Sequence, residues 1–121
     1  MPHIHLEYSD NVELDCKTTL MAVNQAFIGS GHVSNPNDLK SRASCQHDYL
    51  IGLTPDQAQG YVHAKVSLLT GRSIEVQQHI AALILEALEQ SIPKQSRVSL
   101  QLCVEMLEMP KETYAKQVRV V

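Results

Sequence analysis

The chain has 121 residues, of which 44% are hydrophobic and 19% charged, a composition that suits one globular domain with a modest core. Its ten Lys and Arg residues are scattered and its net charge is -3, which argues against nucleic-acid binding. We expect neither a cleavable leader nor a membrane span, because the sequence shows no charged-then-apolar leader pattern and no apolar run of the roughly 18 residues that a span needs. We therefore expect a cytoplasmic protein that makes no membrane contact.

The first half of the chain is predicted to form a strand, a helix and a second strand. Residues 3–8 alternate between apolar and polar side chains, as a strand with two different faces does. Over residues 15–28 the apolar side chains fall at helical spacings, and the Gly-Ser-Gly sequence at 29–31 supplies the stop. Residues 39–52 are predicted to be extended, with the mixed segment 46–49 leaving the end of this strand open.

The second half repeats that order. Thr54-Pro55-Asp56 and Gly60 indicate a loop, after which residues 61–69 place Val and Leu on one side of a predicted strand. Ser73 is the predicted N-cap of an amphipathic helix that ends before Pro93. The alternation over residues 98–106 predicts the last strand, which Pro110 closes.

Two β-α-β units in tandem, over about residues 1–52 and 60–109, predict a single α+β domain with a tail at 110–121. Right-handed crossovers place both helices on one face of a four-stranded mixed sheet. The other face is then left for a partner, so we expect an oligomer. The apolar residues of the tail suggest that it reaches a neighbouring subunit.

The three cysteines, Cys16, Cys45 and Cys103, are an odd number and lack CxxC spacing. This pattern predicts free thiols, with neither a disulfide framework nor a thiolate zinc site.

The sequence begins Met1-Pro2, and removal of the methionine would expose a secondary amine at the start of the first strand. An α-amino group has a reference pKa near 8, which burial or neighbouring cations lower toward neutrality. Pro2 is therefore a candidate general base. If Met1 is retained, the nitrogen is a non-basic amide and this role is lost.

Three basic residues are predicted to approach Pro2. Lys40 and Arg42 begin the second strand, which we expect to run parallel to the first, and Arg72 precedes the helix capped by Ser73. An arginine fork can hold a carboxylate with two hydrogen bonds. Together these cations would bind an anion and depress the pKa of the amine.

Five segments together resemble the 5-carboxymethyl-2-hydroxymuconate isomerase family of the tautomerase superfamily: Met1-Pro2-His3-Ile4, residues 6–11, Lys40-Ser41-Arg42-Ala43, Val62-His63 and Gly71-Arg72-Ser73. The resemblance implies a tautomerase-like homotrimer that uses no cofactor or metal. It also implies a delta-isomerase of homoprotocatechuate breakdown, in which Pro2 moves a proton from a dienol hydroxyl to carbon. Lys40, Arg42 and Arg72 would bind the carboxylates of the substrate. Because some relatives carry Arg at the position of Lys40, Arg42 is expected to take the larger share.

Other interpretations of the sequence stay open. The same trimer could bind a small anion or a protein without turnover, or could act on another unsaturated carboxylate. His47 and Asp48 are adjacent, but neighbours on a strand point to opposite faces and need not interact. His3, His5 and His63 could chelate a metal, but no carboxylate or cysteine lies at a telling spacing, so we predict no metal site.

Overall fold

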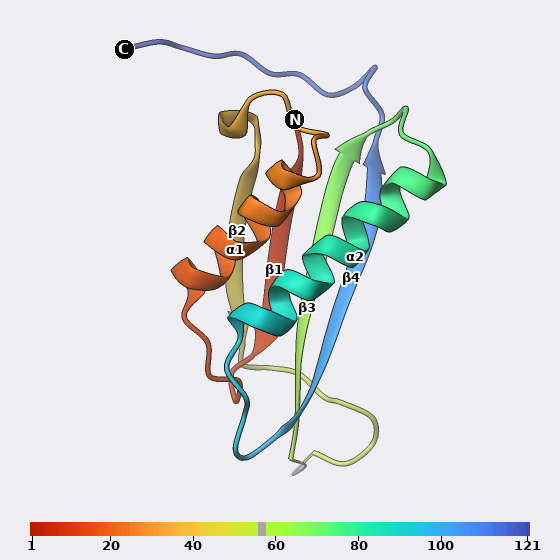
Figure 1. The fold of residues 1–121 in the computed structure, drawn as a ribbon. Coiled ribbons are helices and arrows are strands. Elements are labelled where there is room, and N and C mark those ends of the chain that lie inside the picture. The colour runs from red at the N-terminus through yellow and green to blue at the C-terminus, as the bar shows by residue number, and fades with distance from the viewer. Residues whose placement is uncertain (56–57) are drawn as a thin grey trace.

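The computed structural model describes residues 1–55 and 58–121, which contain one four-stranded sheet and two helices (Figure 1). Asp56, which the sequence places in a loop, lies outside these residues. The elements follow the chain as β1 (His3–Ser9), α1 (Cys16–Gly29), the short 3-10 helix η1 (Pro36–Asp38), β2 (Lys40–Gln46), β3 (Gln59–Leu69), α2 (Ile74–Ser91) and β4 (Ser99–Met109).

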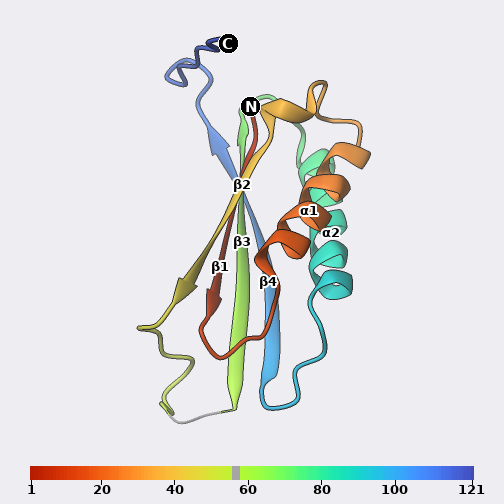
Figure 2. The ribbon, with the colours of Figure 1, turned by 90° about the vertical axis from the view of Figure 1, so that its left-hand side faces the viewer.

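The sheet has the strand order β2-β1-β3-β4 and is mixed. β1 runs parallel to β2 and antiparallel to β3, whereas β3 and β4 are parallel. Figure 2 shows both helices on the same face of the sheet. The predicted α+β arrangement, a β-α-β repeat with two helices covering one face, is confirmed.

Each helix begins at a side chain that caps its free backbone N–H groups. The Asp15 carboxylate accepts a hydrogen bond of 3.2 Å from the Thr18 amide at the start of α1. Ser73 does the same for α2, where its hydroxyl accepts from the Val76 amide at 3.2 Å, so the predicted N-cap is confirmed. These caps fix the points at which both helices leave the sheet.

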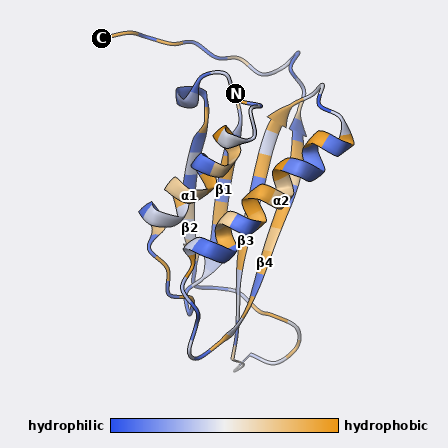
Figure 3. Cartoon of the chain, viewed as in Figure 1, coloured by the Kyte–Doolittle hydropathy of each residue, from blue (hydrophilic) through white to orange (hydrophobic). Residues whose placement is uncertain are grey.

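The core lies between the sheet and the helices. Alternate residues of β1 and β3 face the helices and are almost completely buried, as the period-2 patterns predict. Hydrophobic residues also form stripes along both helices (Figure 3). The largest fully buried side chains are Phe27, Ile4, Leu6, Leu68, Ile80, Ile84, Leu88, Val23, Val62 and Val66.

The second strand is shorter than predicted, because β2 ends at Gln46 and not at Gly52. β2 is an edge strand whose neighbour is β1, and β1 ends at Ser9, the partner of Gln46 in the register. The amide of Asp10 donates to the Gln46 carbonyl at 3.0 Å and completes the pairing. Beyond this point residues 47–52 have no strand to pair with and turn away.

The face of the sheet that carries no helix is polar. His63 contacts Glu105 at 2.8 Å, and Tyr61 donates a hydrogen bond of 3.0 Å to the Glu7 carboxylate. On the β1–β2 side His5 contacts the Ser44 hydroxyl at 3.1 Å. A partner over the middle of this face would therefore meet paired polar groups, whereas the exposed Leu107 stands on the same face toward the start of β1.

Within residues 1–55 and 58–121, neither helix combines the length and hydrophobicity that a membrane crossing requires.

Candidate active site

The predicted site residues gather at one end of the sheet. β1 begins at His3 and β2 begins at Lys40, and these two residues are partners in the parallel register. The Lys40 amide donates a hydrogen bond of 3.2 Å to the Pro2 carbonyl, which ties Pro2 to the start of β2. β3 runs the opposite way, so the connection that carries Arg72 into α2 lies at the same end.

Each predicted cation has a defined position at this end. Lys40 is exposed, and its ammonium donates to the main-chain carbonyl of Asp38 at 3.0 Å. Arg42 is also exposed and donates to Nδ1 of His3 at 3.3 Å.

Arg72 is anchored by its own chain. One guanidinium nitrogen, Nη2, donates to the main-chain carbonyl of His32 at 2.8 Å. The preceding Gly71 has φ of +124°, a conformation that residues with a side chain rarely adopt. The left-handed turn at Gly71 and the bond to His32 hold the guanidinium in place, and its other N–H donors stay available.

The terminal amine of Met1 lies among these charges. Burial lowers its pKa below the ordinary value, and the cations Lys116, Lys40 and Arg72 lower it further. Asp38 acts in the opposite direction. An amine in such a position is neutral, and therefore basic, over a wider range of pH than an exposed one.

Sequence reasoning missed three residues at this end, Asp38, Tyr114 and Lys116, and considered His3 only as a possible metal ligand. The carboxylate of Asp38 pairs with the Lys116 ammonium at 2.5 Å, and the Tyr114 hydroxyl lies 2.9 Å from Nε2 of His3. Asp38 could have been found, because it stands two residues before Lys40. Tyr114 and Lys116 could not, because no periodicity or spacing shows that the tail folds back over its own sheet.

A cleft of about 590 Å³ opens between η1, the start of β2 and the tail. Two cations line it, Lys40 and Lys116, together with the amides of Asn35 and Asn37 and the hydroxyl-bearing Tyr114. Its volume is within the range of ligand sites in proteins. Pro2, Arg42 and Arg72 do not line this cleft directly; they lie around the strand ends beside it.

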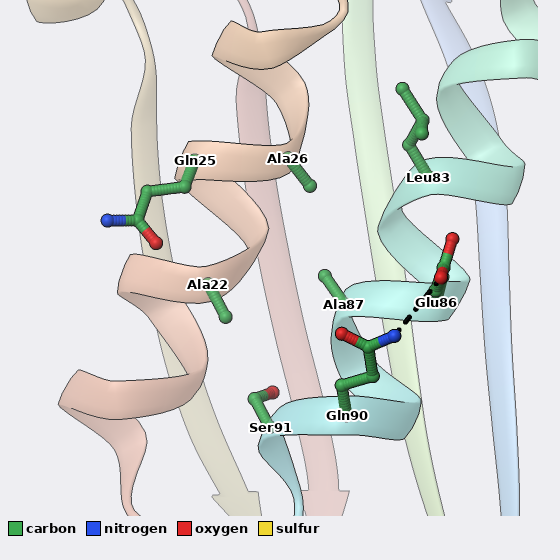
Figure 4. A pocket seen from close by; sticks show the side chains of 8 residues that line it. All are labelled: Ala22, Gln25, Ala26, Leu83, Glu86, Ala87, Gln90 and Ser91. Carbon is green, nitrogen blue, oxygen red and sulfur yellow. Dashed lines mark hydrogen bonds between the residues drawn. The ribbon is translucent and has the colours of Figure 1, made fainter.

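A second cavity, of about 350 Å³, lies between α1 and α2 (Figure 4). Small side chains such as Ala22, Ala26 and Ala87 line it, and the amide of Gln90 donates to Glu86 at 3.1 Å. This cavity contains no cation and belongs to the far side of the helices from the sheet. It therefore does not offer the anion site that the sequence predicts.

The histidines that could have chelated a metal are used separately. His3 contacts Arg42 and Tyr114, whereas His5 contacts Ser44 and His63 contacts Glu105. In the part of the chain that the structure describes, no three His, Cys, Asp or Glu side chains are grouped to hold a metal ion.

His47 does not pair with Asp48, in agreement with the sequence argument, but the reason differs. Neither residue is in a strand, and Nδ1 of His47 contacts the Asp10 carboxylate at 3.0 Å. Both groups lie at the end of the sheet opposite Pro2.

All three cysteines are free thiols, as predicted.

The fold is tautomerase-like, and it is shared with solved 5-carboxymethyl-2-hydroxymuconate isomerase and fused 4-OT structures. A 5-carboxymethyl-2-hydroxymuconate isomerase from Deinococcus radiodurans R1 is 22% identical, with a TM-score of 0.87 over 98% of this chain and 90% of that chain. A 5-carboxymethyl-2-hydroxymuconate delta-isomerase is 18% identical, with a TM-score of 0.81 over 98% of this chain and 89% of the other. A fused 4-OT protein, solved as a symmetric trimer, is 16% identical, with a TM-score of 0.67 over 91% and 87%.

The particular family follows from the sequence. The family model for 5-carboxymethyl-2-hydroxymuconate isomerase matches residues 2–120, and the chain therefore belongs to that family of isomerases. The resemblance stated from the motifs is confirmed. No curated protein sequence matches the chain significantly.

Proposed function

We propose that the protein is a 5-carboxymethyl-2-hydroxymuconate delta-isomerase in which Pro2, freed of Met1, is the general base. The observation that carries this proposal is the surrounding of the terminal amine. Burial, Lys116, Lys40 and Arg72 favour the neutral form of the Met1 amine and outweigh Asp38, which opposes them. After removal of Met1 the terminal amine is the Pro2 nitrogen, one residue further along the chain at the same end of the sheet, and we expect the same charges to act on it.

The reaction then needs one proton and no change in oxidation state. The neutral Pro2 nitrogen takes the proton from the 2-hydroxyl of the dienol, and the electron pair moves through the conjugated system. The ammonium formed at Pro2 returns the proton to a carbon atom, which gives an unsaturated 2-oxo acid. A base whose pKa is near the working pH performs both transfers efficiently. Neither a cofactor nor a metal takes part in these steps.

The cations bind the substrate and stabilise the charge that develops on it. Arg72 is held by His32 and offers its remaining N–H groups to a carboxylate or to the enolate oxygen. Arg42 and Lys40 stand on the neighbouring strand and bind the second carboxylate. We assign the larger share to Arg42, because a guanidinium can form two parallel bonds where an ammonium is a point charge.

The assignment to Pro2 is tested by mass and by mutation. Intact mass of protein from the native host is expected to show loss of Met1. The variant Pro2→Ala is expected to lower kcat/KM by at least about 100-fold in an ultraviolet assay, the usual contribution of a positioned base. Quantitative retention of Met1 in an active protein would overturn the role of Pro2.

The substrate is tested with hydroxymuconates that differ in their side carboxylates. A clear preference for the carboxymethyl compound is expected. Equal rates on all of them would favour a tautomerase with another substrate, and binding of these anions without turnover would favour a non-catalytic homologue.

We also propose that the protein is a homotrimer. The support is the trimeric state of the fused 4-OT structures that share its fold, together with two edge strands, β2 and β4, whose outer backbone groups can pair with another chain. Sedimentation at micromolar concentration is expected to give the trimer mass, and a monomer would contradict the proposal.

A further inference from the structure

The last twelve residues of the sequence form no helix or strand, yet two of their side chains are bonded to the end of the sheet. The Thr70 amide donates to the Met109 carbonyl at 3.0 Å, where the tail leaves β4. Next, the Lys111 ammonium lies beside Gly71, 3.6 Å from the place where a Cβ atom would stand. The tail thus begins next to Arg72.

The tail then crosses the strand ends in the order of the sheet. Tyr114 reaches His3 at the start of β1, and Lys116 reaches Asp38 just before β2. Figure 1 shows this path from the end of β4 across the N-terminus to the side of β2 and η1. The segment therefore forms a strap over the Pro2 end, and its last residues, Val118, Val120 and Val121, remain exposed.

The hydrogen bonds of this strap determine the direction in which Tyr114 donates. Arg42 can only donate, so Nδ1 of His3 is the acceptor at 3.3 Å. The neutral His3 ring must then carry its proton on Nε2, which donates to the Tyr114 oxygen at 2.9 Å. The proton of the Tyr114 hydroxyl is left to donate to a further acceptor, and Tyr114 lines the cleft of about 590 Å³.

The protonation of His3 agrees with this assignment. Burial lowers the pKa of His3, and Arg42 and Lys40 lower it further, so the ring is held neutral. A neutral ring can accept at one nitrogen and donate at the other, as the chain from Arg42 to Tyr114 requires.

Lys116 keeps donors for a ligand as well. Its ammonium has three N–H groups, and its pair with Asp38 at 2.5 Å uses one of them. The exposed fractions of the two side chains are 22% for Lys116 and 24% for Asp38, although the residue Lys116 as a whole is exposed to solvent. Two cations, Lys40 and Lys116, and the carboxylate of Asp38 line the cleft. Its lining therefore carries one net positive charge, which an anionic ligand would balance.

From these contacts we propose that the strap is a wall of the substrate site, and that Lys116 and the Tyr114 hydroxyl bind one carboxylate of a dicarboxylate ligand in the cleft beside Lys40. This inference rests on the proposed function for the identity of the natural substrate. The chemistry that it names, a dicarboxylate held by an ammonium and a phenol, does not depend on turnover.

The test uses binding of adipate, an unreactive six-carbon dicarboxylate, to the full chain lacking Met1, measured by titration calorimetry. Lys116→Met is expected to weaken binding by about tenfold or more, as loss of a hydrogen bond between charged groups does. Lys116→Arg is expected to restore most of the affinity. Tyr114→Phe removes one neutral donor and is expected to weaken binding by about fivefold.

Two controls separate a binding role from a structural one. Lys94→Met removes a cation at the other end of the molecule and is expected to leave the adipate affinity unchanged. Hexanoate, with a single carboxylate, is expected to lose less affinity than adipate in Lys116→Met. Melting temperatures of all variants within a few degrees of the parent would show that the strap variants fold.

The outcomes distinguish this inference from the proposed function. If the parent protein binds adipate and the strap variants do not, the inference holds even where no isomerase activity is found. If Lys116→Met and Tyr114→Phe bind adipate as the parent does, or if the parent does not bind it at millimolar concentration, the inference is overturned. An active isomerase could still be found in that case, since Arg42, Lys40 and Arg72 would then hold the substrate without the strap.

Discussion

The two ends of β1 place titratable groups in opposite electrostatic surroundings. At the Pro2 end, burial and the cations Lys116, Lys40 and Arg72 lower the pKa of the terminal amine. At the other end, burial and a hydrogen bond to Glu7 raise the pKa of Tyr61 to about 12. The hydrogen bond to Cys16, with burial, raises the pKa of Tyr8 to about 12 as well.

The comparison shows that burial alone does not create a reactive group. Burial favours the neutral form at both ends. For an amine the neutral form is the base, whereas for a phenol it is the inert acid. One end of the strand therefore holds an amine that is neutral over a wider range of pH, and the other end holds phenols that keep their protons.

The largest effect on activity is expected at Arg72, because this residue lies at the Pro2 end of β1, where the reaction is proposed to take place. Arg72→Ala should lower kcat/KM by about 100-fold, the usual cost of losing a donor that stabilises developing negative charge. Arg72→Lys should recover little of this loss, because an ammonium cannot bond to His32 and a carboxylate in the same geometry.

Arg97 supplies the matched control for Arg72. It lies in the connection between α2 and β4 at the opposite end, and Arg97→Ala should leave kcat/KM unchanged. A fully active Arg72→Lys, or a loss of the same size in Arg97→Ala, would mean that the cations of the Pro2 end have no special part in the reaction.

Gly60 and Gly71 lie at opposite ends of the sheet and can be compared. Substitution of either should lower the stability of the protein, but only substitution of Gly71 should also lower its activity. A Cβ at Gly60 would stand 2.8 Å from Cγ2 of Val12, so Gly60→Ala should cost about 1–3 kcal/mol of unfolding free energy by overpacking. Gly71→Ala should cost about 1–3 kcal/mol through backbone strain at its φ of +124°. Urea denaturation measures both effects.

Activity then separates the two glycine variants. Gly71 sets the direction in which Arg72 leaves the chain, so Gly71→Ala should also lower kcat/KM at a temperature where it is folded. Gly60→Ala should retain the parent value. Equal activity of the two folded variants would contradict the idea that the turn at Gly71 positions Arg72.

The sequence predicted most of the fold because its periodic patterns are local. The alternation in β1 and β3, the stripe of α2 and the cap at Ser73 are each visible within a few residues. The sequence left the end of β2 open because that end depends on where β1 stops, which is information from a partner strand.

The same distinction between local patterns and long-range contacts applies to the candidate site. The motifs placed Pro2, Lys40 and Arg72 at one end, where the structure brings them, because residues at strand starts follow from topology. The contact of Lys116 with Asp38 spans 78 residues and depends on a tail without periodicity. Only the three-dimensional path of that tail reveals it.

The smallest effect concerns Asp38, a carboxylate that opposes the cations at the Pro2 end. Asp38→Asn should lower the pKa of the amine further, because a group that raises it is removed and Lys116 is no longer paired. A base acts in its neutral form, so the acid limb of the pH profile of kcat/KM should move to lower pH. At a pH below that limb kcat/KM should rise by less than about tenfold, because a tenfold rise would require the pKa of the amine to fall by a full unit.

Asp10 is the matched carboxylate at the opposite end, where it contacts His47 at 3.0 Å. Asp10→Asn should leave the acid limb where it is, because this charge lies at the far end of β1 from the amine. A shift of the limb to higher pH in Asp38→Asn, or the same shift in both variants, would show that the charges nearest the amine do not set its basicity. A shift confined to Asp38→Asn would instead tie the difference between the two ends to a single carboxylate.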